Sequence, residues 1–114
     1  MTLDQNHYLY KFHQSVDWAY IEARFSYFSD NNEKNRFLAA LFYLRTMSQC
    51  SSEAAVKQWS ECPYWRFFCG GEEAIDLREF PYSAGLLDIW SRELSEEGYD
   101  VMVRALFRGE LRAH

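Results

Sequence analysis

The sequence predicts an all-α fold, a compact single domain of five to six helices with a helix-turn-helix-like arrangement. Two observations support this prediction. Apolar residues recur at intervals of three and four along most of the chain, which is the spacing of one helix face, and no segment alternates apolar and polar residues as a strand would. The chain has 114 residues, 48% of them hydrophobic, with two prolines and five glycines. Such a chain suits one domain with a sizeable core.

The N-terminal half is predicted to contain an arm and two helices. Residues 1–15 show no clear periodicity, so we expect an N-terminal arm, and the helical domain would cover 16–114. The first helix begins after Asp17, a suitable N-cap. Its apolar face would carry Trp18, Ile21, Phe25 and Phe28. A second helix over 36–47 is apolar around most of its surface, which favours a central position.

The middle of the chain predicts two short helices. One covers 53–59, and the other covers 64–68, after Pro63 and before the glycine pair 70–71, which favours a helix end. Four aromatic residues lie in or beside this second helix, and such a cluster can stack on nucleic-acid bases. Only Arg66 is interleaved with them, so we interpret the cluster as core packing.

The C-terminal part predicts an irregular acidic connection and two more helices. The connection covers 72–82, and Ser83 caps a helix over 84–94. The last helix covers 99–111. Its expected apolar stripe consists of Tyr99, Met102, Val103, Leu106 and Phe107.

Charge is unevenly distributed along the chain. The total is 12 Lys and Arg against 17 Asp and Glu, a net charge of −5. Residues 1–71 are neutral, residues 72–100 carry nine acids and two arginines, and residues 101–114 carry three arginines and one glutamate. DNA-binding domains usually have a basic excess or stripe. The overall charge therefore argues mildly against tight non-specific DNA binding, and it makes the acidic segment a candidate surface for a basic partner.

No motif indicates a metal, a cofactor or a catalytic group. The three cysteines show no CxxC spacing and the three histidines lie near the termini, whereas a structural zinc site needs about four close Cys or His ligands. A glycine-rich phosphate loop is also lacking. We therefore expect no metal, no cofactor and no catalytic residue. A small enzyme would need a Cys–His pair or paired carboxylates that meet only in the folded chain.

Targeting signals do not appear in the sequence. The first residues lack the basic and apolar regions of a secretory signal, and no apolar run approaches the roughly 18 residues of a membrane helix. An odd number of cysteines then favours reduced thiols. We expect a cytoplasmic protein, free or bound to the nucleoid, without a membrane partner.

Two segments in a fixed order carry a family resemblance. They are "WSECPYWRFFCGGEE" at 59–73 and "FPYSAGLLDIWSRELSEEG" at 80–98, preceded by "DWAYIEARF". With them the chain resembles, over about 16–105, the N-terminal domain of insertion-sequence transposases of the IS-five (InsH-like) family. The first segment matches the family pattern at Trp59, Glu61, Pro63, Tyr64, Trp65, Phe68, Cys69, Gly70 and Glu72. The second matches it at Phe80, Pro81, Leu86, Trp90, Arg92, Leu94, Glu96, Glu97 and Gly98.

The resemblance implies a helical domain that recognises the terminal repeats of a mobile element, ahead of a DDE nuclease domain. Because that nuclease is not among these residues, we expect no cutting or joining of DNA. The chain also departs from the family pattern. "NEKNR" stands where the family usually has a basic G-R-P turn, and Asp88 and Glu93 stand where it usually has arginine or lysine. Each cation lost weakens contact with phosphate.

Two binding functions remain open. The first is a non-catalytic, transposase-derived DNA-binding or regulatory domain that recognises terminal repeats or a promoter, with contacts from Lys34, Arg36, Arg45, Lys57, Arg66 and Arg92. The second is an acidic protein-binding module or inhibitor, including a DNA mimic, with contacts from Glu72, Glu73, Asp76, Glu79, Asp88 and Glu93. The expected partner is DNA or a nucleic-acid-handling protein, and a homodimer is a further option.

Overall fold

The computed structural model describes residues 3–26, 29–94 and 96–113, and every regular element within these ranges is helical. The all-α prediction is confirmed, with seven α-helices among the described residues rather than five or six. In chain order the elements are α1 (Tyr8–Ser15), α2 (Trp18–Arg24), α3 (Asn32–Ser48), α4 (Ser52–Glu61), α5 (Pro63–Gly70), the 3-10 turn η1 (Glu72–Ala74), α6 (Ala84–Glu93) and α7 (Glu96–Ala113).

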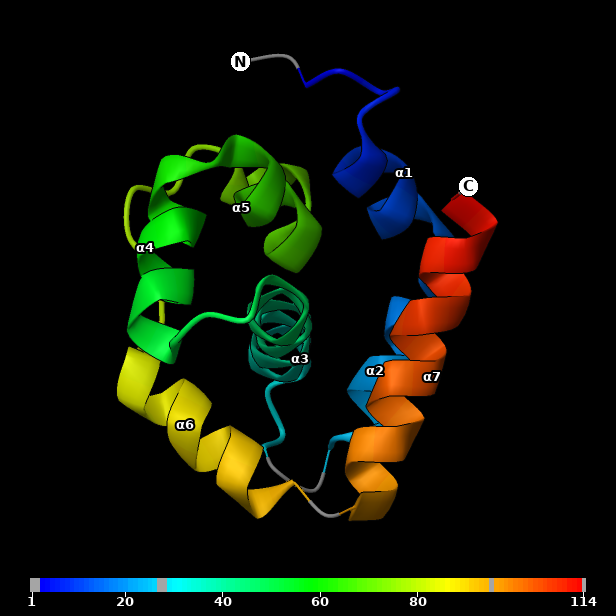
Figure 1. The fold of residues 1–114 in the computed structure, drawn as a ribbon, viewed down its shortest axis with the longest axis vertical. Helices are drawn as coiled ribbons and strands as arrows, with labels where there is room; N and C mark the ends of the chain where they lie inside the picture. Colours follow the sequence, from blue (N-terminus) through cyan, green and yellow to red (C-terminus); the bar gives the residue numbers. More distant parts are fainter. Residues whose placement is uncertain (1–2, 27–28, 95, 114) are drawn as a thin grey trace.

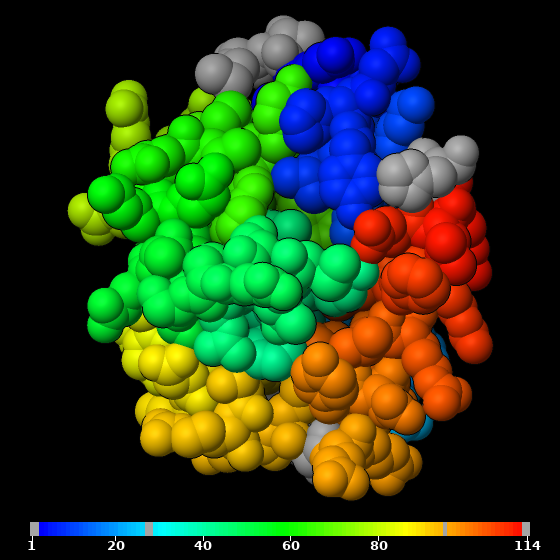
Figure 2. Space-filling view, viewed as in Figure 1, coloured from blue at the N-terminus to red at the C-terminus, as the bar shows by residue number. Residues whose placement is uncertain are grey.

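Helix α3 lies at the centre of the fold, as its apolar sequence predicted. The view along its axis shows the other helices arranged around it (Figure 1). Every residue from Phe37 to Leu44 is buried. The helix begins where the Asn31 side chain accepts a hydrogen bond from the Lys34 amide at 3.1 Å, and it ends at Gln49, whose φ of 54° is left-handed. Its C-terminal end reaches the surface between α4 and α7 (Figure 2).

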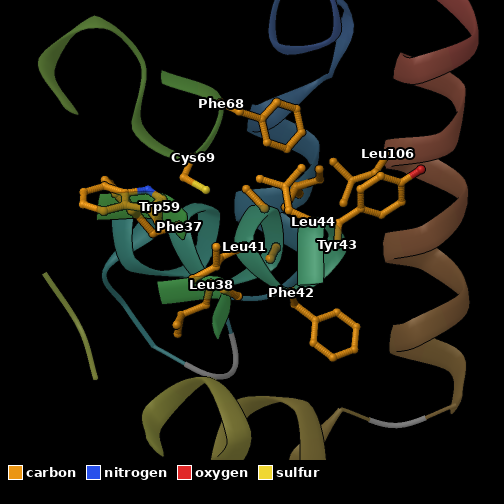
Figure 3. Close-up of a cluster of buried hydrophobic side chains, with 14 of the residues drawn as sticks. Phe37, Leu38, Leu41, Phe42, Tyr43, Leu44, Trp59, Phe68, Cys69 and Leu106 are labelled. Carbon is orange, nitrogen blue, oxygen red and sulfur yellow. The ribbon is translucent and has the colours of Figure 1, made fainter. Parts of the chain in front are cut away.

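Helix α5 buries Phe67 and Phe68 in the core and packs the half-buried Tyr64 and Trp65 against it, so the interpretation as core packing is confirmed. Pro63 occupies the first turn, and the helix ends at Gly71, whose φ of 76° suits glycine. Phe68 is fully buried and points toward the side chains of α3 (Figure 3). At Gly70 a Cβ would lie 2.4 Å from the Phe37 ring, so α3 and α5 approach too closely for any larger residue.

The prediction that residues 1–15 form an arm is wrong for Tyr8–Ser15, which form α1. The His7 ring accepts a hydrogen bond from the Leu9 amide at 3.1 Å and caps the helix. Leu9 and Phe12 are buried, and the Phe12 ring lies 4.5 Å from the Phe68 ring. Eight residues with two buried positions give too short a pattern to reveal the helix, because its stability depends on α5 and α7, against which it packs.

The apolar stripe predicted for the last helix is partly wrong. Met102 and Leu106 are fully buried, but Tyr99 is 41% exposed, Phe107 is 49% exposed and Val103 is half-buried. Helix α7 lies at the edge of the molecule and packs mainly on α1 (Figure 1). The buried face of α7 is therefore narrower than the predicted apolar stripe. On the apolar face predicted for the first helix, Ile21 and Phe25 are buried and Trp18 is half-buried, whereas Phe28 lies outside the described residues.

Candidate nucleic-acid interface

Arg66, a predicted DNA contact, holds the fold together. Its Nε donates to the Ile75 carbonyl and its Nη1 to the Ser60 carbonyl, both at 2.7 Å. These bonds tie α5 to the end of α4 and to the acidic connection that follows η1. These bonds use two of the five N–H groups of the guanidinium and hold the side chain against the fold.

Arg36, the second of these predicted contacts, is also engaged. Its Nη2 donates to the Gly70 carbonyl at 3.3 Å, and its Nη1 lies 3.9 Å from the Glu22 carboxylate. The side chain is 23% exposed. This arginine links α3 to α5 and α2, which is a structural task.

Arg45 connects three helices. Its Nη1 donates to Ser52 Oγ at 2.9 Å and lies 3.4 Å from the Asp88 carboxylate. Its guanidinium also stacks 4.7 Å from the centre of the Phe42 ring. Three of the six predicted DNA contacts are thus occupied by neighbours within the domain.

The other predicted cations come from three separate helices. Lys34 is half-buried at the start of α3, with Nζ 6.0 Å from the centre of the Tyr82 ring. Lys57 on α4 and Arg92 on α6 are exposed. These three side chains are available for contact, and their binding to DNA stays a prediction.

All six acidic residues of the alternative hypothesis are exposed. Asp88 is bonded to its neighbours, since its Oδ1 accepts from Ser52 Oγ at 2.5 Å and pairs with Arg45. Within the described part of the chain, the side chains of the remaining five make no hydrogen bond or ion pair. They are Glu72, Glu73, Asp76, Glu79 and Glu93.

A row of arginines that was not among the predicted DNA contacts lies on the exposed face of α7. Arg104, Arg108 and Arg112 are four residues apart and therefore lie along one side of the helix; we name them the arginine row. Arg104 lies 3.4 Å from Asp100, and Arg112 donates to the Ser15 carbonyl at 3.4 Å. Two features of the sequence could have predicted this row: the net positive charge of residues 101–114 and the four-residue spacing of the arginines.

A further cation lies beside the first turns of α7. Arg24, at the end of α2, lines a hollow of about 450 Å³ together with Glu97 and Val101. The hollow is open to solvent. It places a positive side chain near the N-terminal end of the helix whose C-terminal half carries the arginine row.

Burial shifts the pKa of a cysteine and a histidine in the described part of the chain. Burial raises the pKa of the Cys69 thiol, which is fully enclosed beside Trp59 (Figure 3). Burial also lowers the pKa of His13, whose Nδ1 lies 3.1 Å from the Phe68 carbonyl. Among the described residues, no group of three or more His, Cys, Asp or Glu could hold a metal ion. Nor does any helix described in the structure have the length and apolar character to cross a membrane.

These features define a small all-α domain, built around a buried central helix and charged on its outer surfaces. The chain belongs to the transposase domain (DUF772) family, whose model matches residues 1–80. It is also similar to "Uncharacterized protein ORF8 in nfe locus" of Rhizobium meliloti, with 33% identity over 70 residues. The match covers 61% of this chain and 33% of the relative, so the chain spans about a third of that protein's length. No solved structure matches.

Proposed function

We propose that this transposase-related domain is non-catalytic and binds double-stranded DNA, such as the terminal repeats of a mobile element or a promoter. We place the contact on the arginine row of α7, with Arg24 as a neighbouring cation. The observation that carries the proposal is the exposure of three arginines on one side of one helix. Membership of a transposase domain family gives the reason to choose DNA as the partner.

The spacing of the arginine row suits a phosphate backbone. Eight residues separate its two ends, which is about 12 Å at 1.5 Å per residue. That length corresponds to about three to four base pairs of DNA at 3.4 Å each. Arginine also donates to phosphate through a planar, bidentate group. Because the whole chain carries a net charge of −5, we expect binding to be weak and strongly dependent on salt.

A pair of matched charge reversals tests this proposal. Arg108→Glu with Arg112→Glu should weaken binding to a labelled 24-base-pair duplex at least about tenfold at low salt, measured by fluorescence anisotropy. Lys57→Glu with Arg92→Glu changes the net charge equally but on other helices, and it should have a smaller effect. Equal loss in both variants would place the contact elsewhere. No binding of the unaltered chain to random, promoter or terminal-repeat duplexes would reject the function.

The acidic surface supports a second candidate function, a module that binds a basic partner protein. Its motivation is the five exposed carboxylates that have no partner within the described residues. Glu72→Lys with Glu73→Lys should abolish capture of such a protein but strengthen DNA binding. Asp88 is unsuitable for this test, because it is bonded to Ser52 and Arg45. Capture that survives the reversal would exclude these residues from the interface.

A further inference from the structure

The outer side of α7 exposes two apolar side chains beside the arginine row. Phe107 is 49% exposed and Leu111 is 57% exposed, and the four-residue spacing makes them neighbours on the helix surface. The helix lies at the edge of the molecule, where its outer side is open to a partner (Figure 1). Adjacent exposed apolar side chains on one helix face are a candidate contact, whereas scattered single ones are ordinary.

The same side of α7 has the spacing of a helix-pairing seam. Asp100, Arg104, Phe107 and Leu111 follow one another at intervals of four, three and four residues, and all four are exposed. This alternation keeps side chains on the face that meets a partner helix in coiled coils. The two polar members, Asp100 and Arg104, lie 3.4 Å apart and pair with each other. A helix packed on this face would therefore meet no unpaired charge in the seam itself.

Charge is divided between the two halves of α7. The N-terminal half carries exposed acids at Glu96, Glu97 and Asp100, and the C-terminal half carries the arginine row. The remaining acid, Glu110, is half-buried and accepts a hydrogen bond from the Tyr43 hydroxyl of α3, so it belongs to the inner side. Two such helices attract each other when they run in opposite directions, because each acidic half then faces an arginine row.

We propose that two copies of the chain associate through the outer sides of α7, with the two helices antiparallel and related by a two-fold axis. A two-fold interface uses the same patch on both copies, so that patch must be complementary to itself. Helix α7 meets this condition, whereas any other partner would have to supply both charges in the matching order. Phe107 and Leu111 would be buried between the helices. Since a contact between two single helices is small, the dimer should be weak, with a dissociation constant in the micromolar range.

Association would regulate the DNA contact, and this part of the inference rests on the proposed function. The arginine row cannot bind phosphates and the acids of a second copy at the same time. Duplex DNA and the second copy therefore compete for α7. A low protein concentration favours the monomer that binds DNA, and a high concentration favours the dimer that does not.

Sedimentation velocity of the full chain without DNA, from low micromolar to millimolar concentration, tests the association. We expect a concentration-dependent shift from monomer to dimer. Phe107→Ser with Leu111→Ser should weaken the dimer at least about tenfold, because the central apolar contact is lost. Leu77→Ser with Ile89→Ser removes two exposed apolar side chains from other segments and should leave the dimer unchanged. A chain that is monomeric at every concentration, or equal weakening in both variants, would overturn the proposal.

Two charge variants and their mixture test the pairing of the halves. Glu96→Lys with Asp100→Lys makes both halves of α7 mainly basic, and Arg108→Glu with Arg112→Glu makes both mainly acidic. Each variant alone should stay monomeric, because like charges then face each other. An equimolar mixture should form a heterodimer, which also shows that both variants are folded. No association in the mixture, or undiminished dimers of either variant alone, would reject the charge pairing.

The competition is tested with the labelled duplex. Added to the dimer, it should produce a DNA-bound monomer. Phe107→Ser with Leu111→Ser keeps every arginine, so it should bind the duplex at least as tightly as the unaltered chain. A dimer that binds no duplex would reject the proposed function alone, and duplex binding by a chain that never dimerises would reject this inference alone. A dimer that stays intact on the duplex would overturn the competition.

Discussion

The hydroxyl of Ser52 donates a hydrogen bond of 2.5 Å to the carboxylate of Asp88, joining the start of α4 to α6. Arg45 reaches both groups, with Nη1 at 2.9 Å from Ser52 Oγ and 3.4 Å from Asp88 Oδ1. Arg45 was a candidate for DNA contact and Asp88 for contact with a basic partner. The two residues bind each other, and with Ser52 they join three helices of the domain.

Removal of the Asp88 carboxylate should destabilise the domain. Ser52 is 4% exposed, so Asp88→Ala leaves a buried hydroxyl without its acceptor. We expect a loss of about 1–2 kcal/mol in the free energy of unfolding, measured by urea denaturation. Glu79→Ala, an exposed acid without such a bond, should change stability by less than about 0.5 kcal/mol. Equal stability of the two variants would mean that the Ser52–Asp88 bond contributes nothing.

Gly70→Ala should be strongly destabilising. The new Cβ would lie 2.4 Å from the Phe37 ring and 2.6 Å from the Ala74 Cβ, and a buried ring cannot retreat cheaply. Overpacking of this kind typically costs about 1–3 kcal/mol. Gly85→Ala is the control, because on α6 the nearest atom to its Cβ is 3.8 Å away and alanine favours a helix. Its melting temperature should rise or stay unchanged, whereas that of Gly70→Ala should fall by several degrees.

The sequence predicted the central helix, which has a long apolar pattern. It did not predict a short helix or the width of a buried helix face, because both depend on tertiary contacts. Residues 36–47 are apolar around the helix, and α3 is central as expected. Helix α1 has only Leu9 and Phe12 buried, so its pattern is too short to stand out. In α7 the apolar spacing extends beyond the covered face, since neighbouring helices decide how much of a stripe is buried.

The candidate site was harder to predict than the fold, because a basic residue can either bond within the fold or face solvent. Arg36 and Arg66 donate to backbone carbonyls that are 34 and nine residues away in sequence. No local pattern distinguishes such an arginine from one that faces solvent. The arginine row differs, because its four-residue spacing on an amphipathic helix is visible in the sequence alone.

Two of the three cysteines should react readily with a thiol reagent and the third should not. Cys50 and Cys62 are half-buried, whereas Cys69 is 0% exposed and burial raises the pKa of its thiol. Only thiolates are reactive. Ellman's reagent should therefore titrate two thiols in the folded chain and three in guanidinium chloride. Rapid reaction of all three under native conditions would contradict the packing of Cys69 against α3.

Stability should decrease as the pH falls below about 6.5, in part because of His13. Burial lowers the pKa of this histidine from its ordinary value of 6.5, so the unfolded chain takes up a proton more readily than the folded one. The stabilising contribution is complete above the unfolded pKa and is lost as the pH falls through the folded pKa. His13→Asn keeps a donor for the Phe68 carbonyl without a titrating ring. Its unfolding free energy, measured in urea between pH 7.5 and 5, should fall less than that of the unaltered chain; parallel curves would contradict the assignment.

The salt dependence of DNA affinity should report how many phosphates the arginine row contacts. Each neutralised phosphate adds about 0.9 to the slope of log affinity against log salt, so three or four contacts predict a loss of about 40- to 150-fold between 50 and 200 mM salt. Arg108→Glu with Arg112→Glu should lower the slope by about two, because two of the contacts disappear. Arg104→Gln should lower it by less than one, since Asp100 already neutralises part of that charge at 3.4 Å. A slope that stays the same in all three proteins would show that the DNA lies on another surface, even if affinity falls.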